Sequence, residues 1–154
     1  MKSLLFISIS LLLTFKQGLT QENKTSYDAQ MAKKLGADAM GMRTYVIAFL
    51  KSGTVKLTDS LQRADLQKAH LKNISRMTEE GKLILAGPFL DNQSLRGIYI
   101  FDVSSVEEAK ELTSTDPAIK AGTLVMELHP WYGSAALKEL PGLHKLIQKK
   151  GFGE

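Results

Sequence analysis

The chain contains no cysteine among its 154 residues. This absence excludes disulfide bonds, thiolate catalysis, cysteine metal sites and a lipidated N-terminal cysteine. The folded state must therefore rest on a hydrophobic core, alone or shared with a partner chain. Hydrophobic residues make up 44% of the sequence, which at this length is enough for one core, so we expect a single globular domain.

Common catalytic and cofactor-binding motifs are also missing. The sequence has no HExxH metal motif, no phosphate-binding loop, no dinucleotide fingerprint and no GxSxG elbow. Its three histidines, His70, His129 and His144, do not have the spacing of a metal site. We therefore expect no metal and no cofactor, and neither nucleotide-dependent nor serine-hydrolase chemistry.

The surplus of positive charge is small. The formal net charge is +4, and it falls to +2 if the first 20 residues are removed, because Lys2 and Lys16 leave and no acid does. A domain that binds nucleic acid needs clustered lysine and arginine rather than a small surplus. We therefore expect no nucleic-acid partner, and we interpret the basic end of the chain, Gln148-Lys149-Lys150, as a solvated helix face.

No hydrophobic run is long enough to span a bilayer. The N-terminal run over residues 4–15 follows Met1-Lys2 and has the size of a signal-peptide core. Gly18 and Thr20 are the small residues expected just before a cleavage site at Gln21. We predict a signal peptide over residues 1–20, export to the periplasm or the extracellular space, and no stable membrane span after cleavage. The alternative is an uncleaved anchor.

Residues 21–42 are predicted to form a leader or linker with about one helical turn. Gly36 and Gly41 interrupt any longer helix. The folded domain is predicted over residues 43–133. A C-terminal helical tail, divided by Pro141, is predicted over residues 134–154.

Within the domain, alternating apolar residues predict strands over residues 44–51, 82–86, 95–103 and 123–129. Helical spacing and N-cap residues predict helices over residues 60–80 and 106–114, and a short helical turn that starts at Asp116-Pro117. Residues 130–133 are interpreted as an aromatic corner after the last strand. This order is that of the α+β, ferredoxin-like βαββαβ fold, a four-stranded antiparallel sheet with helices on one face.

Two of the predicted strands, over residues 44–51 and 95–103, are apolar on both faces. Helices on one face of the sheet would leave the other face bare. We therefore expect a second copy to bury that face, which gives a homodimeric α+β barrel. Such packing leaves a cavity between the sheet and the first long helix, where a small-molecule ligand can bind.

His70 is the main candidate for chemistry in this cavity. It shares a helix face with Ile74 and Met77, at spacings i, i+4 and i+7. An imidazole can act as a general acid or base near the working pH of most enzymes. The alternative is a histidine that is hydrogen-bonded within the core.

Four segments carry a resemblance to a known family: AHLKNISRMTEEGKLILAGPF, RGIYIFDV, SSVEEAKEL followed by TDPAIKAG, and ELHPWYGSAAL. Over residues 43–137 the chain resembles the YCII-related (YciI-like) family, most specifically in the helix histidine, the Gly-x-Leu-x-x-x-Gly-Pro strand and the Asp-Pro turn. The resemblance implies a dimeric α+β barrel and a site built on His70 and Asp116. Its relatives with an assigned activity are dehydrochlorinases and related small-molecule enzymes, similar in fold to muconolactone isomerases.

Asp116 and four other residues complete the candidate site. Asp116 can orient His70, although capping the turn at Pro117 also explains it, and its two oxygens allow both roles. The candidates for substrate binding are Arg96, Glu127, His129 and Trp131. The simpler interpretations are an ion pair of Arg96 with Asp91 or Asp102, an exposed strand edge for Glu127 and His129, and a lid over the core or dimer seam for Trp131.

The sequence thus predicts a cofactor-free small-molecule enzyme that abstracts a proton, eliminates or isomerises, with His70 moving the proton and Asp116 orienting it. The alternative is a non-catalytic ligand-binding or assembly protein on the same dimeric barrel. An enzyme needs His70 within hydrogen-bond reach of a partner and beside an open cavity, whereas a structural histidine would be enclosed and satisfied.

Overall fold

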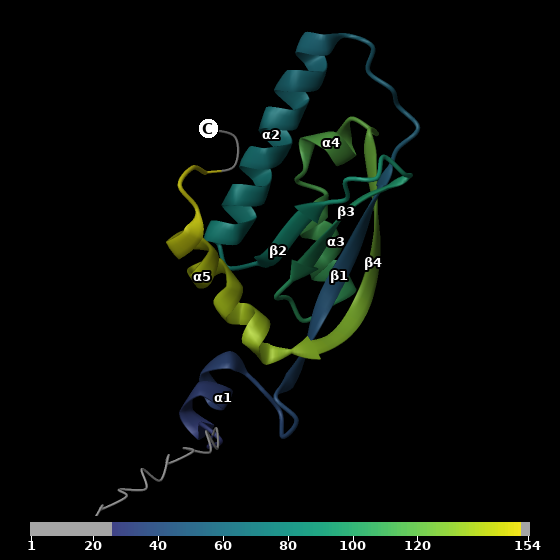
Figure 1. The fold of residues 1–154 in the computed structure, drawn as a ribbon. Helices are drawn as coiled ribbons and strands as arrows, with labels where there is room; N and C mark the ends of the chain where they lie inside the picture. The colour runs from purple at the N-terminus through teal and green to yellow at the C-terminus, as the bar shows by residue number, and fades with distance from the viewer. Residues whose placement is uncertain (1–25, 152–154) are drawn as a thin grey trace, which may run out of the picture.

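The structure, a computed structural model, describes residues 26–151 (Figure 1). One antiparallel sheet has the strand order β2-β3-β1-β4. Its strands are β1 (Met42–Ser52), β2 (Leu83–Pro88), β3 (Leu95–Phe101) and β4 (Leu124–Ser134). The helices are α1 (Ala29–Leu35), α2 (Ser60–Glu79), α3 (Val106–Thr113), α4 (Pro117–Lys120), the 3-10 helix η1 (Ala135–Glu139) and α5 (Leu140–Ile147).

The central part of this order confirms the predicted α+β, ferredoxin-like βαββαβ fold. The predicted signal peptide over residues 1–20 lies outside the described residues and stays a prediction. Between residues 26 and 151, none of the helices has the length and hydrophobicity needed to cross a membrane.

Local sequence signals explain where α2 begins and ends. The carboxylate of Asp59 accepts hydrogen bonds from the backbone N–H groups of Leu61 and Gln62, at 2.7 and 3.1 Å, so it caps the first turn. Gly81, with φ of 70°, follows the helix in the left-handed conformation that glycine adopts without strain. The helix therefore ends within one residue of the predicted boundary.

The leader before β1 is more regular than predicted. In place of a linker with about one turn, α1 extends over seven residues. Asp28 caps its start by accepting hydrogen bonds from Gln30 and Met31, and Gly36 ends it at φ 67°. Gly36 thus terminates a helix rather than interrupting one, which is the usual place for a left-handed glycine.

Both edge strands extend beyond the predicted boundaries, as does β1 by two residues at its start and one at its end. Residues 130–133 were predicted to form a corner, but they continue β4, where Pro130 pairs with Val46 and Trp131 with Tyr45. At the other edge, β2 continues to Pro88 instead of ending before Gly87. Both are edge strands, so a proline that lacks a backbone N–H costs the sheet no internal hydrogen bond.

The main core lies between the sheet and helices α2 and α3, where buried side chains from β1, β3 and both helices meet. The other face of the sheet is partly covered by the chain itself. Leu137 of η1 and Leu140 of α5 pack against buried Tyr45 and Ile100, at one end of that face. The C-terminal tail therefore covers part of the surface that was expected to be bare, and Figure 1 shows α5 lying beside β2.

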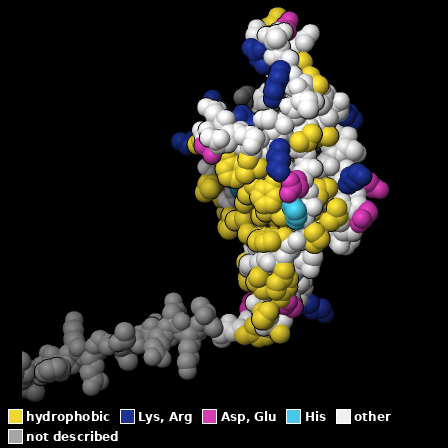
Figure 2. All heavy atoms as spheres, turned by 90° about the vertical axis from the view of Figure 1, so that its right-hand side faces the viewer, with side chains coloured by type: hydrophobic (Ala, Val, Ile, Leu, Met, Phe, Trp, Pro, Cys, Tyr) yellow, Lys and Arg dark blue, Asp and Glu magenta, His cyan; other side chains and the backbone are white. Residues whose placement is uncertain are grey.

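The rest of that face remains open in the single chain. Phe49 and Ile47 of β1 are half-buried there, and Val125 of β4 is 48% exposed. Figure 2 shows hydrophobic side chains gathered across the middle of the molecule when it is seen from the side of β4. A continuous apolar area of this kind is typical of an interaction surface.

Replacement of Phe101 by Ala should strongly destabilise the fold. Phe101 is fully buried in the main core and contacts the Tyr99 ring edge-to-face, so its loss leaves a cavity that should cost about 3–5 kcal/mol of unfolding free energy. Urea denaturation followed by circular dichroism measures the change. Leu90→Ala, at a position that is 90% exposed, is the control and should change it by less than about 0.5 kcal/mol. Equal effects would contradict this description of the core.

Candidate active site

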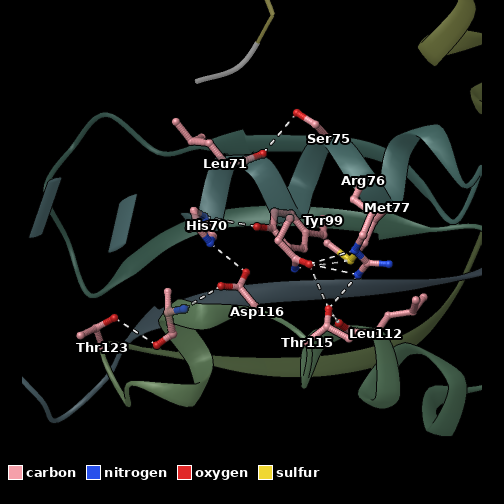
Figure 3. Close-up of polar contacts among 12 residues, drawn as sticks. His70, Leu71, Ser75, Arg76, Met77, Tyr99, Leu112, Thr115, Asp116 and Thr123 are labelled. Atoms are coloured by element: carbon pink, nitrogen blue, oxygen red, sulfur yellow. Dashed lines mark hydrogen bonds and ion pairs between the residues drawn. The ribbon is translucent and has the colours of Figure 1, made fainter. Parts of the chain in front are cut away.

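His70 and Asp116 meet in the core although they are 46 positions apart in the sequence. His70 lies on the buried face of α2 and is 8% exposed, and Asp116 caps α4 and is fully buried. The distance from Nδ1 of His70 to Oδ2 of Asp116 is 2.8 Å (Figure 3). The structure therefore brings together the two residues that were predicted to form the site.

Asp116 serves two partners with its two oxygens. Oδ1 accepts a hydrogen bond from the backbone N–H of Ala118 at 2.8 Å, which is the N-cap of α4, while Oδ2 faces the imidazole. A carboxylate only accepts hydrogen bonds, so Nδ1 of His70 must be the donor. In the neutral imidazole, the proton then sits on Nδ1 and the lone pair on Nε2.

Tyr99 of β3 lies on the other side of the imidazole. Its hydroxyl oxygen is 3.4 Å from Nε2 of His70, a long hydrogen bond. Burial, together with the negative charge of Asp116, raises the pKa of the Tyr99 hydroxyl above its usual value. The phenol therefore stays protonated and is the donor in this contact. The role of Tyr99 was not predicted from the sequence, because an aromatic residue in an alternating strand is typical of any core.

A second polar cluster fixes the turn that carries Asp116. Asn73, one turn after His70 on α2, has its Oδ1 atom 3.1 Å from Oγ1 of Thr115 and 3.0 Å from Nη2 of Arg76. Arg76 also donates a hydrogen bond to Thr115 at 2.9 Å. Thr115 directly precedes Asp116, so one helix holds both the histidine and the turn of its carboxylate partner. A buried asparagine on an apolar helix face was the signal in the sequence, and it was overlooked.

The imidazole borders a pocket of about 220 Å³ between α2 and the sheet. Its walls are mainly apolar and include Leu71 and Ile74 of α2 and Leu124 of β4. Two larger hollows, of about 670 and 420 Å³, lie elsewhere, and His70 lines neither. The larger one is lined by charged residues that pair with one another. The other has mainly apolar walls and is lined by His144. The pocket beside His70 differs from both, because a buried carboxylate holds the imidazole that borders it.

Of the four predicted substrate-binding residues, Arg96 lines this pocket and the other three do not. Side chains alternate along β4, and its leucines Leu124 and Leu128 face the helices. Glu127, His129 and Trp131 therefore point to the opposite face of the sheet, away from His70. The structure does not bring these three residues to the site, and their contact with a ligand stays a prediction.

On that opposite face, Glu127 forms a charged cluster. It accepts a hydrogen bond from Lys51 and lies 2.8 Å from Nε2 of His129. These two partners hold the pKa of the Glu127 carboxyl below its usual value, with Lys51 making the larger contribution. Among residues 26–151, no three acidic or histidine side chains lie close enough together to hold a metal ion.

A family model for the YCII-related domain matches residues 44–132, more than half of the chain. The chain belongs to this family. The part that matches includes β2, β3, most of β1 and β4, and both residues of the His70–Asp116 pair. The tail that contains η1 and α5 lies beyond it.

The proteins similar to this YCII-related chain include the two that follow. One is uncharacterized protein YjpA of Bacillus subtilis (strain 168), which is 31% identical over 62 residues, or 40% of this chain and 71% of YjpA. The other is a solved structure, 5-chloro-2-hydroxyhydroquinone dehydrochlorinase (TftG) of Burkholderia phenoliruptrix AC1100, in complex with 2,5-dihydroxybenzoquinone. It has 24% sequence identity and a TM-score of 0.42, and the match covers 58% of this chain and 93% of that one.

Asp116→Ala should destabilise the protein more than loss of a helix cap alone. Asp59→Ala, which removes the cap of α2, is the matched control and should cost about 1 kcal/mol. Asp116→Ala also leaves Nδ1–H of buried His70 without its acceptor, which should add about 1–3 kcal/mol. Urea denaturation of both variants measures the difference. Equal losses would mean that Asp116 acts only as a cap.

Proposed function

We propose that this YCII-related domain is a cofactor-free enzyme that moves a proton on a small, largely apolar molecule. His70 is the general base and acid, and Asp116 positions it. The observation that carries the proposal is the placement of one imidazole: a buried carboxylate holds its Nδ1 at 2.8 Å, and the same ring borders a pocket with mainly apolar walls.

The hydrogen bonds assign a role to each ring nitrogen. Nδ1 keeps its proton on the side of Asp116, so Nε2 is the atom that accepts a proton from the substrate. The Asp116 carboxylate then stabilises the imidazolium that forms. In an isomerisation Nε2 returns the proton to a different carbon, and in an elimination the electron pair of the broken C–H bond expels a leaving group.

Tyr99 supplies the hydrogen-bond donor for this chemistry. Its hydroxyl stays protonated and contacts Nε2 only at 3.4 Å, so a substrate oxygen can take over that donor when the substrate reaches His70. A negative charge that develops on the oxygen during proton removal is stabilised by such a donor. The apolar walls of the pocket exclude water, and this strengthens the electrostatic interactions of His70 and Tyr99 with the substrate.

One observation favours the alternative, a non-catalytic ligand-binding protein. His70 is only 8% exposed and both of its ring nitrogens have a partner, as in a histidine that serves the core. The two functions differ in what the loss of the imidazole does: turnover disappears in an enzyme, whereas only stability changes in a binding protein.

His70→Gln should abolish proton transfer. A thermal-shift screen of small carbonyl compounds first selects ligands that raise the melting temperature. Proton NMR in D₂O then follows deuterium incorporation into the selected compounds, and loss of the general base should slow it by about 10²–10⁴-fold. His144→Gln, which removes an imidazole of α5 outside this pocket, should leave the rate unchanged. Exchange that persists in His70→Gln would refute the proposed role.

We also propose that the protein is a homodimer that buries the open sheet face. The support is the apolar area on that face, which includes half-buried Phe49 and exposed Val125 and which the C-terminal tail covers only at one end. Burial of this surface against a second copy would remove it from water. In a dimer with a two-fold axis, the apolar face of one chain packs against the same face of the other chain. The same packing would enclose the cluster of Lys51, Glu127 and His129.

Phe49→Glu should convert the dimer into a monomer. A carboxylate at position 49 would lie opposite Glu127 on β4, and dimerisation would bury this extra negative charge among apolar side chains. Sedimentation velocity at a fixed protein concentration measures the mass. Leu90→Glu, at a highly exposed position outside this face, is the control and should stay dimeric. A wild-type chain that sediments as a monomer would contradict the proposal.

A further inference from the structure

Arg96 borders the His70 pocket because of an irregularity in β3. Opposite β1, Leu50 pairs with Gly97 and Lys51 pairs with Leu95, so Arg96 is an extra residue between two regular pairs. An extra residue of this kind forms a β-bulge, which redirects a side chain and is common beside binding sites. Without the bulge, strict alternation would separate Arg96 from Tyr99, which faces the imidazole.

The charge of Arg96 is not neutralised within the domain. Its guanidinium makes one weak contact, 3.5 Å from Nη1 to the carbonyl oxygen of Gln93. Asp102, one of its two predicted partners, is paired with Arg43 at 2.5 Å and with Lys138 at 3.1 Å. Over residues 26–151, no carboxylate lies within ion-pair distance of Arg96.

The pocket itself also lacks a counter-charge at its surface. Among the described residues that line it there is no aspartate and no glutamate, and Asp116 lies behind the His70 ring. Gln67, an exposed residue of α2, adds a neutral polar group. The pocket therefore offers three things to a ligand: apolar walls, one proton acceptor and one cation without a partner.

From this combination we infer that the pocket selects small apolar molecules that carry a carboxylate, and that Arg96 binds the carboxylate. A guanidinium presents parallel N–H donors that match the two oxygens of a carboxylate. Binding of that group fixes which carbon of the substrate lies next to His70, so Arg96 determines specificity. The inference deepens the proposed function. It rests on that proposal only in taking the pocket beside His70 as the place where the ligand binds.

Benzoate and benzamide test this inference, because they share an apolar ring and differ in charge. Isothermal titration calorimetry on the full chain measures both dissociation constants. Benzoate should bind about tenfold more tightly than benzamide, and Arg96→Gln should weaken benzoate binding about tenfold while leaving benzamide unchanged. Arg96→Lys, which keeps the charge, should recover part of the affinity.

Lys72→Gln is the matched control for the loss of one positive charge. Lys72 is exposed on α2 and does not line the pocket, so benzoate binding should change by less than about twofold. Arg96→Gln should also melt at the wild-type temperature, because Arg96 is exposed. Equal affinities for benzoate and benzamide, no measurable benzoate binding, or full benzoate binding by Arg96→Gln would each overturn the inference.

These outcomes separate the inference from the proposed function. The calorimetric test measures binding only, so it does not depend on turnover by His70. If Arg96→Gln binds benzoate normally while His70→Gln loses deuterium exchange, the inference about Arg96 fails and the proton-transfer proposal stands. If Arg96→Gln loses benzoate binding while deuterium exchange is independent of His70, the proton-transfer proposal fails and the inference about Arg96 stands.

Discussion

The buried carboxylate of Asp116 is the constraint on which the site depends. A carboxylate that is removed from water needs hydrogen bonds to offset the loss of its hydration. Asp116 is fully buried, and its two oxygens meet the first turn of α4 and the imidazole of His70. The same group therefore stabilises a short helix and fixes the proton on one nitrogen of the histidine, so structure and proposed chemistry cannot be separated at this residue.

The rest of the domain places that carboxylate. Helix α2 holds His70 and, one turn later, Asn73, whose contacts with Thr115 and Arg76 fix the turn before Asp116. The sheet supplies Tyr99 from the opposite side. Rigid helices and strands position functional groups more accurately than flexible loops do. Here His70 comes from a helix and Tyr99 from a strand, while Asp116 lies in the turn that the Asn73 contacts fix.

Much of this architecture could be predicted from the sequence. Alternating apolar residues identify the four strands, and cap residues such as Asp59 and Asp116 mark helix starts, because both signals are local. The pairing of His70 with Asp116 came from the resemblance to the YCII-related family, since no local rule links residues 46 positions apart. The sequence also suggested that the sheet is apolar on both faces, and the structure shows that the C-terminal tail covers one end of the second face.

What could not be predicted depends on pairing between distant segments. Pro130 ends a strand by local rules, yet it is tolerated in β4 because that strand forms an edge of the sheet. Glu127 and His129 were candidates for ligand binding, with an exposed strand edge as the simpler interpretation, and the side that they occupy is set by the leucines of β4 that face the helices. Arg96 reaches the pocket through a bulge next to Gly97, and a glycine within a strand is a signal of a bulge that was not used in the prediction.

The most direct test of this account is the protonation pattern of the His70 ring. Long-range ¹⁵N–¹H correlation spectra of the neutral imidazole distinguish a proton on Nδ1 from a proton on Nε2. The account predicts the Nδ1–H form, with a slowly exchanging proton that is lost in Asp116→Ala. A proton on Nε2 in the wild-type protein, or a spectrum that does not change in Asp116→Ala, would contradict it.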